Sequence, residues 1–208
     1  MSFISILGGT FELGWHHALA EDAMSSVESF VSWEEFAARR LSKRRTVELP
    51  AFEISETCLK LESLMELQPQ LFNVAETFKD YCGAVDKALE QFGTRLPTED
   101  ELETAMGCRL FPWGDELPVG IPYGKETSFR GHLKPSITGL VYNGDTYKTE
   151  LTHSALKLGD GGEAVCGGYP WPMAWLTFSP AYRIDSAELC DDVLYEFMRE
   201  TEIRQVRL

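Results

Sequence analysis

Residues 94–116 read TRLPTEDELETAMGCRLFPWGDE and form the most informative stretch of the chain. Thr98 and Glu101 have the S/T-x-x-E spacing of a capping box, in which both side chains satisfy free amides at the start of a helix. Gly107 is the kind of residue that ends such a helix, and residues 111–115 (FPWGD) follow as a tight aromatic turn. The stretch therefore predicts a short capped helix that leads directly into an acidic turn.

Further segments extend this pattern along much of the chain. They are residues 8–14 (GGTFELG), residues 45–57 (RTVELPAFEISET), which alternate as a strand does, and residues 74–82 (VAETFKDYC). Together these segments resemble the formylglycine-generating enzyme family, which has an RLPTE and YPWGDE signature. The resemblance implies strands at the first two segments and, at the third, the helix that precedes RLPTE. The resemblance implies an α+β chain with a C-type-lectin-like fold of short irregular strands and flanking helices, and we expect one domain over residues 1–208.

The chain departs from this family where the family carries its chemistry. Members that oxidise a substrate cysteine bind copper through two cysteines, and their spacing falls here near Pro172 and Thr177. Neither side chain binds copper as a thiolate does, so copper-dependent formylglycine formation is not expected and no cofactor is predicted. The calcium-binding segment of the family is degraded to NGDTYKTEL, in which Asn143, Asp145 and Glu150 leave a structural calcium ion as an open alternative.

The composition limits the classes of partner. The chain has 208 residues, 44% of them hydrophobic, and a formal net charge of -14. Such a charge repels phosphate backbones and anionic lipids, so neither nucleic acid nor membrane is an expected partner. No apolar run is long enough to span a bilayer and no secretion signal is evident at the N-terminus, so we expect a cytoplasmic location.

One short basic run contrasts with this acidic balance. It comprises Arg39, Arg40, Lys43, Arg44 and Arg45. Cations near the end of a helix complement its dipole, so a solvated helix end is favoured over a phosphate site.

A glycine-rich segment in the second half supplies the candidate catalytic residues. Residues 158–168 read LGDGGEAVCGG, in which two glycine pairs flank a predicted strand. Asp160 and Glu163 have carboxylates that can orient an ammonium group or act as a base, and Cys166 is placed to contact a ligand. For Cys166 a packed, inert thiol is the favoured alternative, and for the glycines it is a pair of tight turns.

Four further residues are predicted to bind a substrate. Arg183 can hold a carboxylate or sulfate through its planar guanidinium, and His132 is a second polar candidate. Trp171 and Trp175 belong to an aromatic run beside the glycine-rich segment, most of which is expected to fill the core.

The remaining histidines and cysteines give no metal site. His16 and His17 are adjacent, which should point their rings apart on a strand, and His132 and His153 lie in separate segments. A chelating trio assembled by folding is a minor alternative.

The five cysteines include no close pair, so free thiols are expected. Cys82 is expected to be buried on an apolar helical face with Phe78, Val85, Leu89 and Phe92.

Three helices are expected besides the one after Thr98. Ser32 and Glu35 repeat the capping-box spacing before a helix that runs to about Leu41, and residues 74–92 form an amphipathic helix. Residues 187–199 predict a helix appended to the domain, with an exposed apolar stripe.

These observations leave two functional hypotheses. The first is a diverged enzyme of a bacterial biosynthetic pathway that acts on a small, cationic, amino-acid-derived substrate. The alternative is a non-catalytic ligand-binding or scaffold protein that contacts another enzyme through the C-terminal helix.

Overall fold

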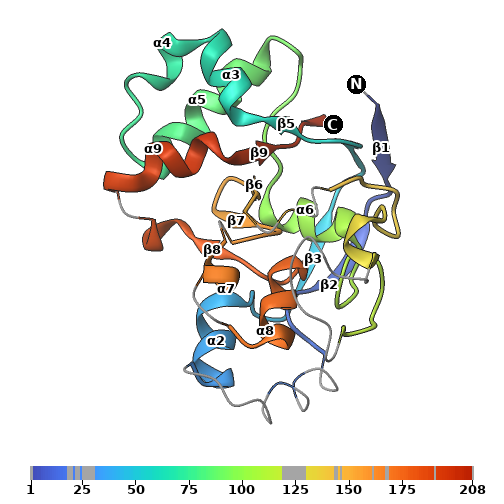
Figure 1. Cartoon of the computed structure of the whole chain (residues 1–208). Helices are drawn as coiled ribbons and strands as arrows, with labels where there is room; N and C mark the ends of the chain where they lie inside the picture. Colours follow the sequence, from blue (N-terminus) through green and yellow to red (C-terminus); the bar gives the residue numbers. More distant parts are fainter. Residues whose placement is uncertain are drawn as a thin grey trace.

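A computed structural model describes residues 2–17, 21, 24, 31–118, 130–142, 145, 147–160, 162–166, 169–189 and 191–207. At positions 163, 165, 171, 191–193 and 196 it describes the backbone but not the side chain. Short strands and short helices alternate along the chain (Figure 1), which confirms the predicted α+β class.

The strands are β1 (Phe3–Ile6), β2 (Gly9–Leu13), β3 (Arg45–Leu49), β4 (Phe52–Ser55), β5 (Leu59–Lys60), β6 (Thr149–Leu151), β7 (Ala155–Lys157), β8 (Ile184–Asp185), β9 (Thr201–Ile203) and β10 (Val206–Arg207). The α-helices are α2 (Trp33–Arg40), α3 (Leu61–Leu67), α4 (Pro69–Phe72), α5 (Phe78–Glu90), α6 (Glu99–Met106), α7 (Glu163–Cys166), α8 (Trp171–Trp175) and α9 (Asp191–Arg199). Short 3-10 helices are η1 (Gly131–Leu133), η2 (Leu176–Phe178) and η3 (Ser186–Glu188).

The strands of the described residues form three sheets. The largest has the order β5-β9-β6-β7-β8, in which β6 and β9 are parallel and the other neighbours are antiparallel. A second sheet has the antiparallel order β1-β4-β10, and β2 pairs with β3. The β2–β3 pair joins the two segments that the sequence predicts as strands, since Gly9 lies opposite Leu49 and Leu13 opposite Arg45.

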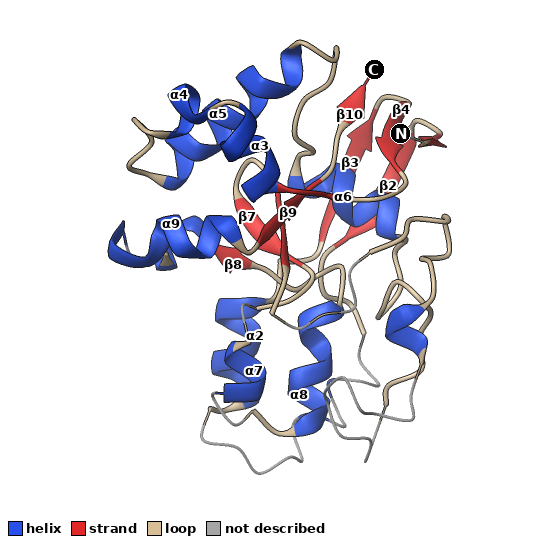
Figure 2. Ribbon diagram, turned by 45° about the horizontal axis from the view of Figure 1, so that its top comes forward, coloured by secondary structure: helices blue, strands red, loops and turns tan. Residues whose placement is uncertain are grey.

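The helices lie in two groups on opposite sides of the sheets. Helices α3, α4 and α5 form one group, and α2, α7 and α8 form the other (Figures 1 and 2). Helix α9 packs against α3, and α6 packs against β2. Within the described residues, no helix is long and apolar enough to cross a membrane.

The predicted capped helix is present as α6. The Thr98 hydroxyl accepts a hydrogen bond from the Glu101 amide, and the Glu101 carboxylate accepts one from the Thr98 amide, as a capping box requires. Gly107 ends the helix with a φ of 90°, a value that favours glycine. In the turn that follows, the Asp115 carboxylate accepts the Leu110 amide at 2.9 Å. These local predictions are confirmed.

The predicted amphipathic helix is present as α5, which begins at a second capping box formed by Thr77 and Asp80. Most of its predicted apolar face is buried, namely Phe78, Cys82, Val85 and Leu89. Phe92 is not part of this face, because α5 ends at Glu90 and a turn follows in which Gly93 has a φ of 66°. The Phe92 side chain is 62% exposed as a result.

The C-terminal helix is present as α9, but it is not an appendage. The chain continues into β9, which lies between β5 and β6, and into β10, which pairs with β4. Leu194 and Met198 are buried in the main hydrophobic cluster. Among the described side chains of this helix, Leu194, Phe197 and Met198 pack in or against the core, which differs from the predicted exposed apolar stripe.

Candidate functional site

An open pocket of about 420 Å³ lies where α2, β3, α6 and the segment before β8 meet. Its lining combines cationic, acidic and hydroxyl side chains, and the charged ones are Arg39, Lys43, Arg45, Arg183, Glu99 and Asp100. Ser42 and Ser154 add hydroxyl groups. A concave site of this size with converging polar groups is suited to a small molecule.

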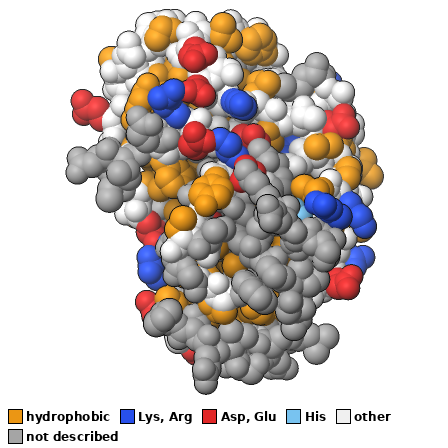
Figure 3. Space-filling model, in the orientation of Figure 1, with side chains coloured by type: hydrophobic (Ala, Val, Ile, Leu, Met, Phe, Trp, Pro, Cys, Tyr) orange, Lys and Arg blue, Asp and Glu red, His pale blue; other side chains and the backbone are white. Residues whose placement is uncertain are grey.

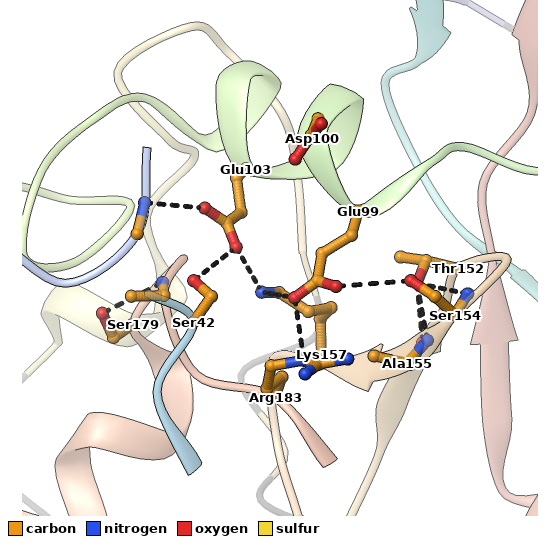
Figure 4. A network of polar contacts seen from close by, with 12 residues as sticks. Ser42, Glu99, Asp100, Glu103, Thr152, Ser154, Ala155, Lys157, Ser179 and Arg183 are labelled. Carbon is orange, nitrogen blue, oxygen red and sulfur yellow. Dashed lines mark hydrogen bonds and ion pairs between the residues drawn. The ribbon is translucent and has the colours of Figure 1, made fainter. Parts of the chain in front are cut away.

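Lys157 lies beside this pocket and is only 1% exposed. Its ammonium donates to Oε1 of Glu103 at 2.8 Å and to Oε1 of Glu99 at 3.1 Å. Figure 4 shows Lys157 reaching from β7 to the two carboxylates, both of which come from α6. The four-residue spacing of Glu99 and Glu103 places both on one face of that helix.

Glu103 is the buried centre of the network. Its carboxylate also accepts the Ser42 hydroxyl at 2.8 Å and the Gly14 amide at 3.1 Å. Burial raises the pKa of Glu103, but the charge and hydrogen bond of Lys157, with the charge of Arg45, outweigh burial and leave the pKa below its ordinary value. Glu103 is therefore ionised at neutral pH and orients the Ser42 hydroxyl at the pocket wall.

Gly14 allows the end of β2 to approach this network. It has a φ of 81°, and a Cβ at this position would clash with the Lys43 carbonyl. Only glycine accommodates both the positive φ and this close approach, which brings the Gly14 amide to Glu103.

The outer wall of the pocket consists of ion pairs. Arg45 donates through Nε to Asp100 at 2.9 Å, and Arg39 pairs with Glu188 at 2.7 Å. Burial lowers the pKa of Arg45, but the charges of Glu103 and Asp100 outweigh it, so that the pKa is raised. The pKa of Arg39 is also raised, by its hydrogen bond to Glu188, so both arginines are cations.

Backbone hydrogen bonds bring Arg183 to the same wall. The Ser42 amide donates to the Ala181 carbonyl at 2.7 Å, and the Arg183 amide donates to the Arg40 carbonyl at 2.8 Å. The Arg183 side chain then lies with Nε 3.1 Å from Oε1 of Glu99. Arg183 is thus a predicted site residue that the structure places in the pocket.

Asp160 has a different position from the one expected. The segment between the glycines forms helix α7 rather than a strand, because the buried Asp160 carboxylate accepts the amides of Gly162 and Ala164 at its start. Gly162 has a φ of 88°, a conformation that favours glycine, in the turn that leads into α7. This corrects the strand prediction and gives Asp160 a capping role.

Cys166 ends α7 and is exposed. Its Sγ lies 3.9 Å from the Tyr147 hydroxyl. The side chains of Glu163 and Trp171, and the residues 167–168, lie outside the part of the chain that the structure describes.

His132 and Trp175 belong to the aromatic core. Both are buried, with ring centroids 5.4 Å apart, and His132 also stacks on Phe178 at 6.2 Å. Burial, with the charge of Arg130, lowers the pKa of His132. Full burial of Trp175 assigns it to packing rather than to contact with a substrate in an open pocket.

No group of three histidine, cysteine, aspartate or glutamate residues is placed to hold a metal within the described residues. Of the calcium candidates, Glu150 is ion-paired with Arg204 and Asn143 lies outside the described residues. The Asp145 carboxylate accepts the Tyr147 amide at 3.1 Å.

The rings of His16 and His17 do not point apart as predicted. Both residues lie after β2 ends, and their rings stack with centroids 4.3 Å apart. Adjacent side chains point to opposite faces only within a strand, and β2 ends at Leu13, so the two rings can lie on the same side.

Acidification should destabilise the fold through His17. Burial and the charge of His16 lower the pKa of His17 from 6.5 to about 4, against the opposing charge of Asp115. The unfolded chain therefore takes up this proton at higher pH than the folded chain, so stability is complete above pH 6.5 and falls towards pH 4. We expect a loss of about 1–2 kcal/mol for this partly buried ring. Urea unfolding across this range should show a smaller loss for His17→Gln, and equal losses would contradict the assignment.

Several residues of the pocket were not predicted from the sequence. Lys157 carries a recognisable signal, since a lysine within the short buried strand β7 requires a partner. Glu99 and Glu103 carry the four-residue spacing of one helical face. Arg39, Lys43 and Arg45 belong to the basic run visible in the sequence, for which a solvated helix end was the favoured interpretation. Ser42 carries no comparable signal, because only the fold brings it to α6.

No protein-family model matches this sequence, and no curated protein is significantly similar to it.

Proposed function

We propose that this pocket binds a small, zwitterionic, amino-acid-derived molecule, and that the chain is a diverged relative of the formylglycine-generating enzyme family. The observation that carries the proposal is the arrangement of cations and carboxylates around one open pocket of about 420 Å³. If the chain is an enzyme, we propose that this molecule is its substrate.

The charges of the pocket favour a zwitterion. Cations outnumber carboxylates in the lining itself, but Glu103, Asp185 and Glu188 pair with lining arginines from just outside it. The pocket as a whole is therefore close to neutral, and it presents separate sites for the two ends of an amino acid. The expectation from the sequence was a cationic, amino-acid-derived substrate with Arg183 placed to hold a carboxylate or sulfate, and the pocket favours a zwitterion of that class.

The two ends of the ligand have distinct partners. Lys43 and Arg183 line the pocket and can bind a carboxylate, Arg183 as a cation whose Nε and Nη1 also lie near Glu99 and Asp185. Asp100 and Glu99 can accept hydrogen bonds from an ammonium group. Within the described residues Lys43 has no ion-pair partner, so its ammonium is available to an incoming anion.

Three local features support the family resemblance. The GGTFELG and RTVELPAFEISET segments pair as β2 and β3, the RLPTE segment caps α6, and the FPWGD segment forms a closed turn. Glu99 of the RLPTE segment faces the pocket. We propose the C-type-lectin-like fold on this basis. The alternative of a scaffold that binds through α9 has less support, since Leu194 and Met198 are buried.

Calorimetric titration with a panel of free L-amino acids tests the proposal. At least one should bind, and its N-acetyl and methyl-ester derivatives should bind about tenfold more weakly, because each removes one charged end. Arg183→Met and Lys43→Met should weaken binding by about tenfold or more, since each removes a charged donor. Arg44→Met is the matched control, because Arg44 pairs with Glu12 and does not line the pocket.

The outcomes separate the hypotheses. No binding by any amino acid, or equal loss in Arg44→Met, would contradict the proposed pocket. Mass spectrometry of the bound molecule after incubation then tests turnover. Binding without a product would support the ligand-binding alternative against the enzyme.

A further inference from the structure

A second hollow of about 440 Å³ lies between β1, the end of α3, the turn after α5 and β10. Unlike the charged pocket, its lining is mainly apolar, with Phe3, Leu59, Leu67 and Phe92 among the lining residues. We call it the apolar groove. Ligand sites of small molecules typically fall within this size range and have this kind of lining.

Two large apolar side chains at this groove are exposed to solvent. Leu67 is 78% exposed and Phe92 is 62% exposed. Apolar side chains also reach the surface at the end of the molecule where α3, α4 and α5 lie (Figures 1 and 3). An isolated exposed leucine is ordinary, but two such residues beside one apolar hollow leave a surface that a ligand would cover favourably.

The charged residues among the described lining of the groove are both cations. Lys60 and Arg207 line it, and none of its described lining residues is acidic. Arg207 lies with its guanidinium carbon 4.1 Å from the centroid of the Phe3 ring and donates to Glu53 at 2.5 Å. This contact holds a cation at the edge of the apolar surface. Glu53 pairs with Arg207 from just outside the lining, so Lys60 is the lining cation without an ion-pair partner among the described residues.

We propose that the apolar groove binds a small amphiphilic carboxylate, such as a medium-chain fatty acid. Its hydrocarbon chain lies against Leu59, Leu67 and Phe92, and its carboxylate meets Lys60 and Arg207. The charge of the groove selects an anion over a cation of the same hydrocarbon length. The volume of the hollow selects a small molecule over a protein segment.

Titration calorimetry with hexanoate, octanoate and decanoate below their micellar concentrations tests this site. Affinity should rise about fourfold for each added methylene that the groove covers. Decyltrimethylammonium, which has a similar chain and the opposite charge, should bind at least tenfold more weakly than decanoate, because the ammonium of Lys60 repels its head group and attracts the carboxylate.

Three variants locate the ligand. Leu67→Asp, Phe92→Asp and Lys60→Glu should each weaken decanoate binding by about tenfold or more, since each places a carboxylate in the groove. Val74→Asp is the matched control, because Val74 is 76% exposed but does not line the groove. The side chains of Leu67, Phe92, Lys60 and Val74 are all exposed, so the four substitutions should leave the fold intact.

Binding of decanoate that is lost in the groove variants and kept in Val74→Asp would support the proposal. Equal binding of the two charged amphiphiles, or equal loss in Val74→Asp, would overturn it. A concentration-dependent dimer that Leu67→Asp abolishes, without decanoate binding, would instead assign the groove to an interface between two copies of the chain. Mutation of Arg183 should leave decanoate binding unchanged, so failure of this site is distinguishable from failure of the charged pocket.

Discussion

Arg204→Met is expected to lower the free energy of unfolding by about 3–5 kcal/mol. The Arg204 side chain is fully buried and donates through Nε and Nη2 to the two carboxylate oxygens of Glu150, at 2.7 and 2.8 Å. Its other donors bind the carbonyls of Ser55, Glu56 and Val141 at 2.8–3.1 Å. The substitution would leave a buried carboxylate and three carbonyls without this partner, which is why the effect should be large.

Arg207→Met is the matched control for this prediction. Arg207 lies in the next strand, is 47% exposed and pairs with Glu53 at the surface, so its loss should cost no more than about 1 kcal/mol. The double variant Arg204→Met and Glu150→Leu should recover part of the lost stability, since it removes the buried charge. Urea unfolding followed by circular dichroism measures all three. Equal costs for the two arginine variants would contradict the role of Arg204.

The sequence predicted the structural features that depend on residues close together along the chain. The capping box of α6 and the cap of α2 rest on residues three positions apart, so no distant partner was needed to find them. Strands were expected within residues 8–14 and 45–57, and the structure adds that β2 pairs with β3. In contrast, β9 and β10 are too short to show a periodic pattern, and they left α9 looking like the end of the domain.

The candidate site was predicted less well, because contacts between distant segments assemble it. Arg183 was identified from its chemistry, but its partner Glu99 lies in α6, where the sequence indicated only a capped helix. Asp160 was predicted as a catalytic group, and in the fold its carboxylate accepts two amides at the start of α7. An acidic residue among glycines fits both roles, and only the backbone conformation separates them.

Lys157→Met is the second substitution expected to have a large effect, at about 3 kcal/mol at neutral pH. Lys157 and Glu103 are 1% and 2% exposed, so removal of the ammonium leaves a buried carboxylate with less compensating charge. Arg45, 3.3 Å from Glu103, and the Ser42 hydroxyl remain as partners, which limits the loss. Lys148→Met is the control, because Lys148 pairs with the exposed Glu200 and should contribute no more than about 1 kcal/mol.

The effect of Lys157→Met should depend on pH in a way that identifies Glu103 as its cause. In the natural protein the pKa of Glu103 lies below 4.5, so its contribution to stability is present above that pH and is lost as the pH falls through the folded value. Without Lys157, burial raises this pKa, and protonation of Glu103 relieves the penalty in acid. The difference in unfolding free energy between the two proteins should therefore shrink from pH 7 towards pH 4. A constant difference would show that lost packing of the lysine stem, rather than the charge of Glu103, causes the destabilisation.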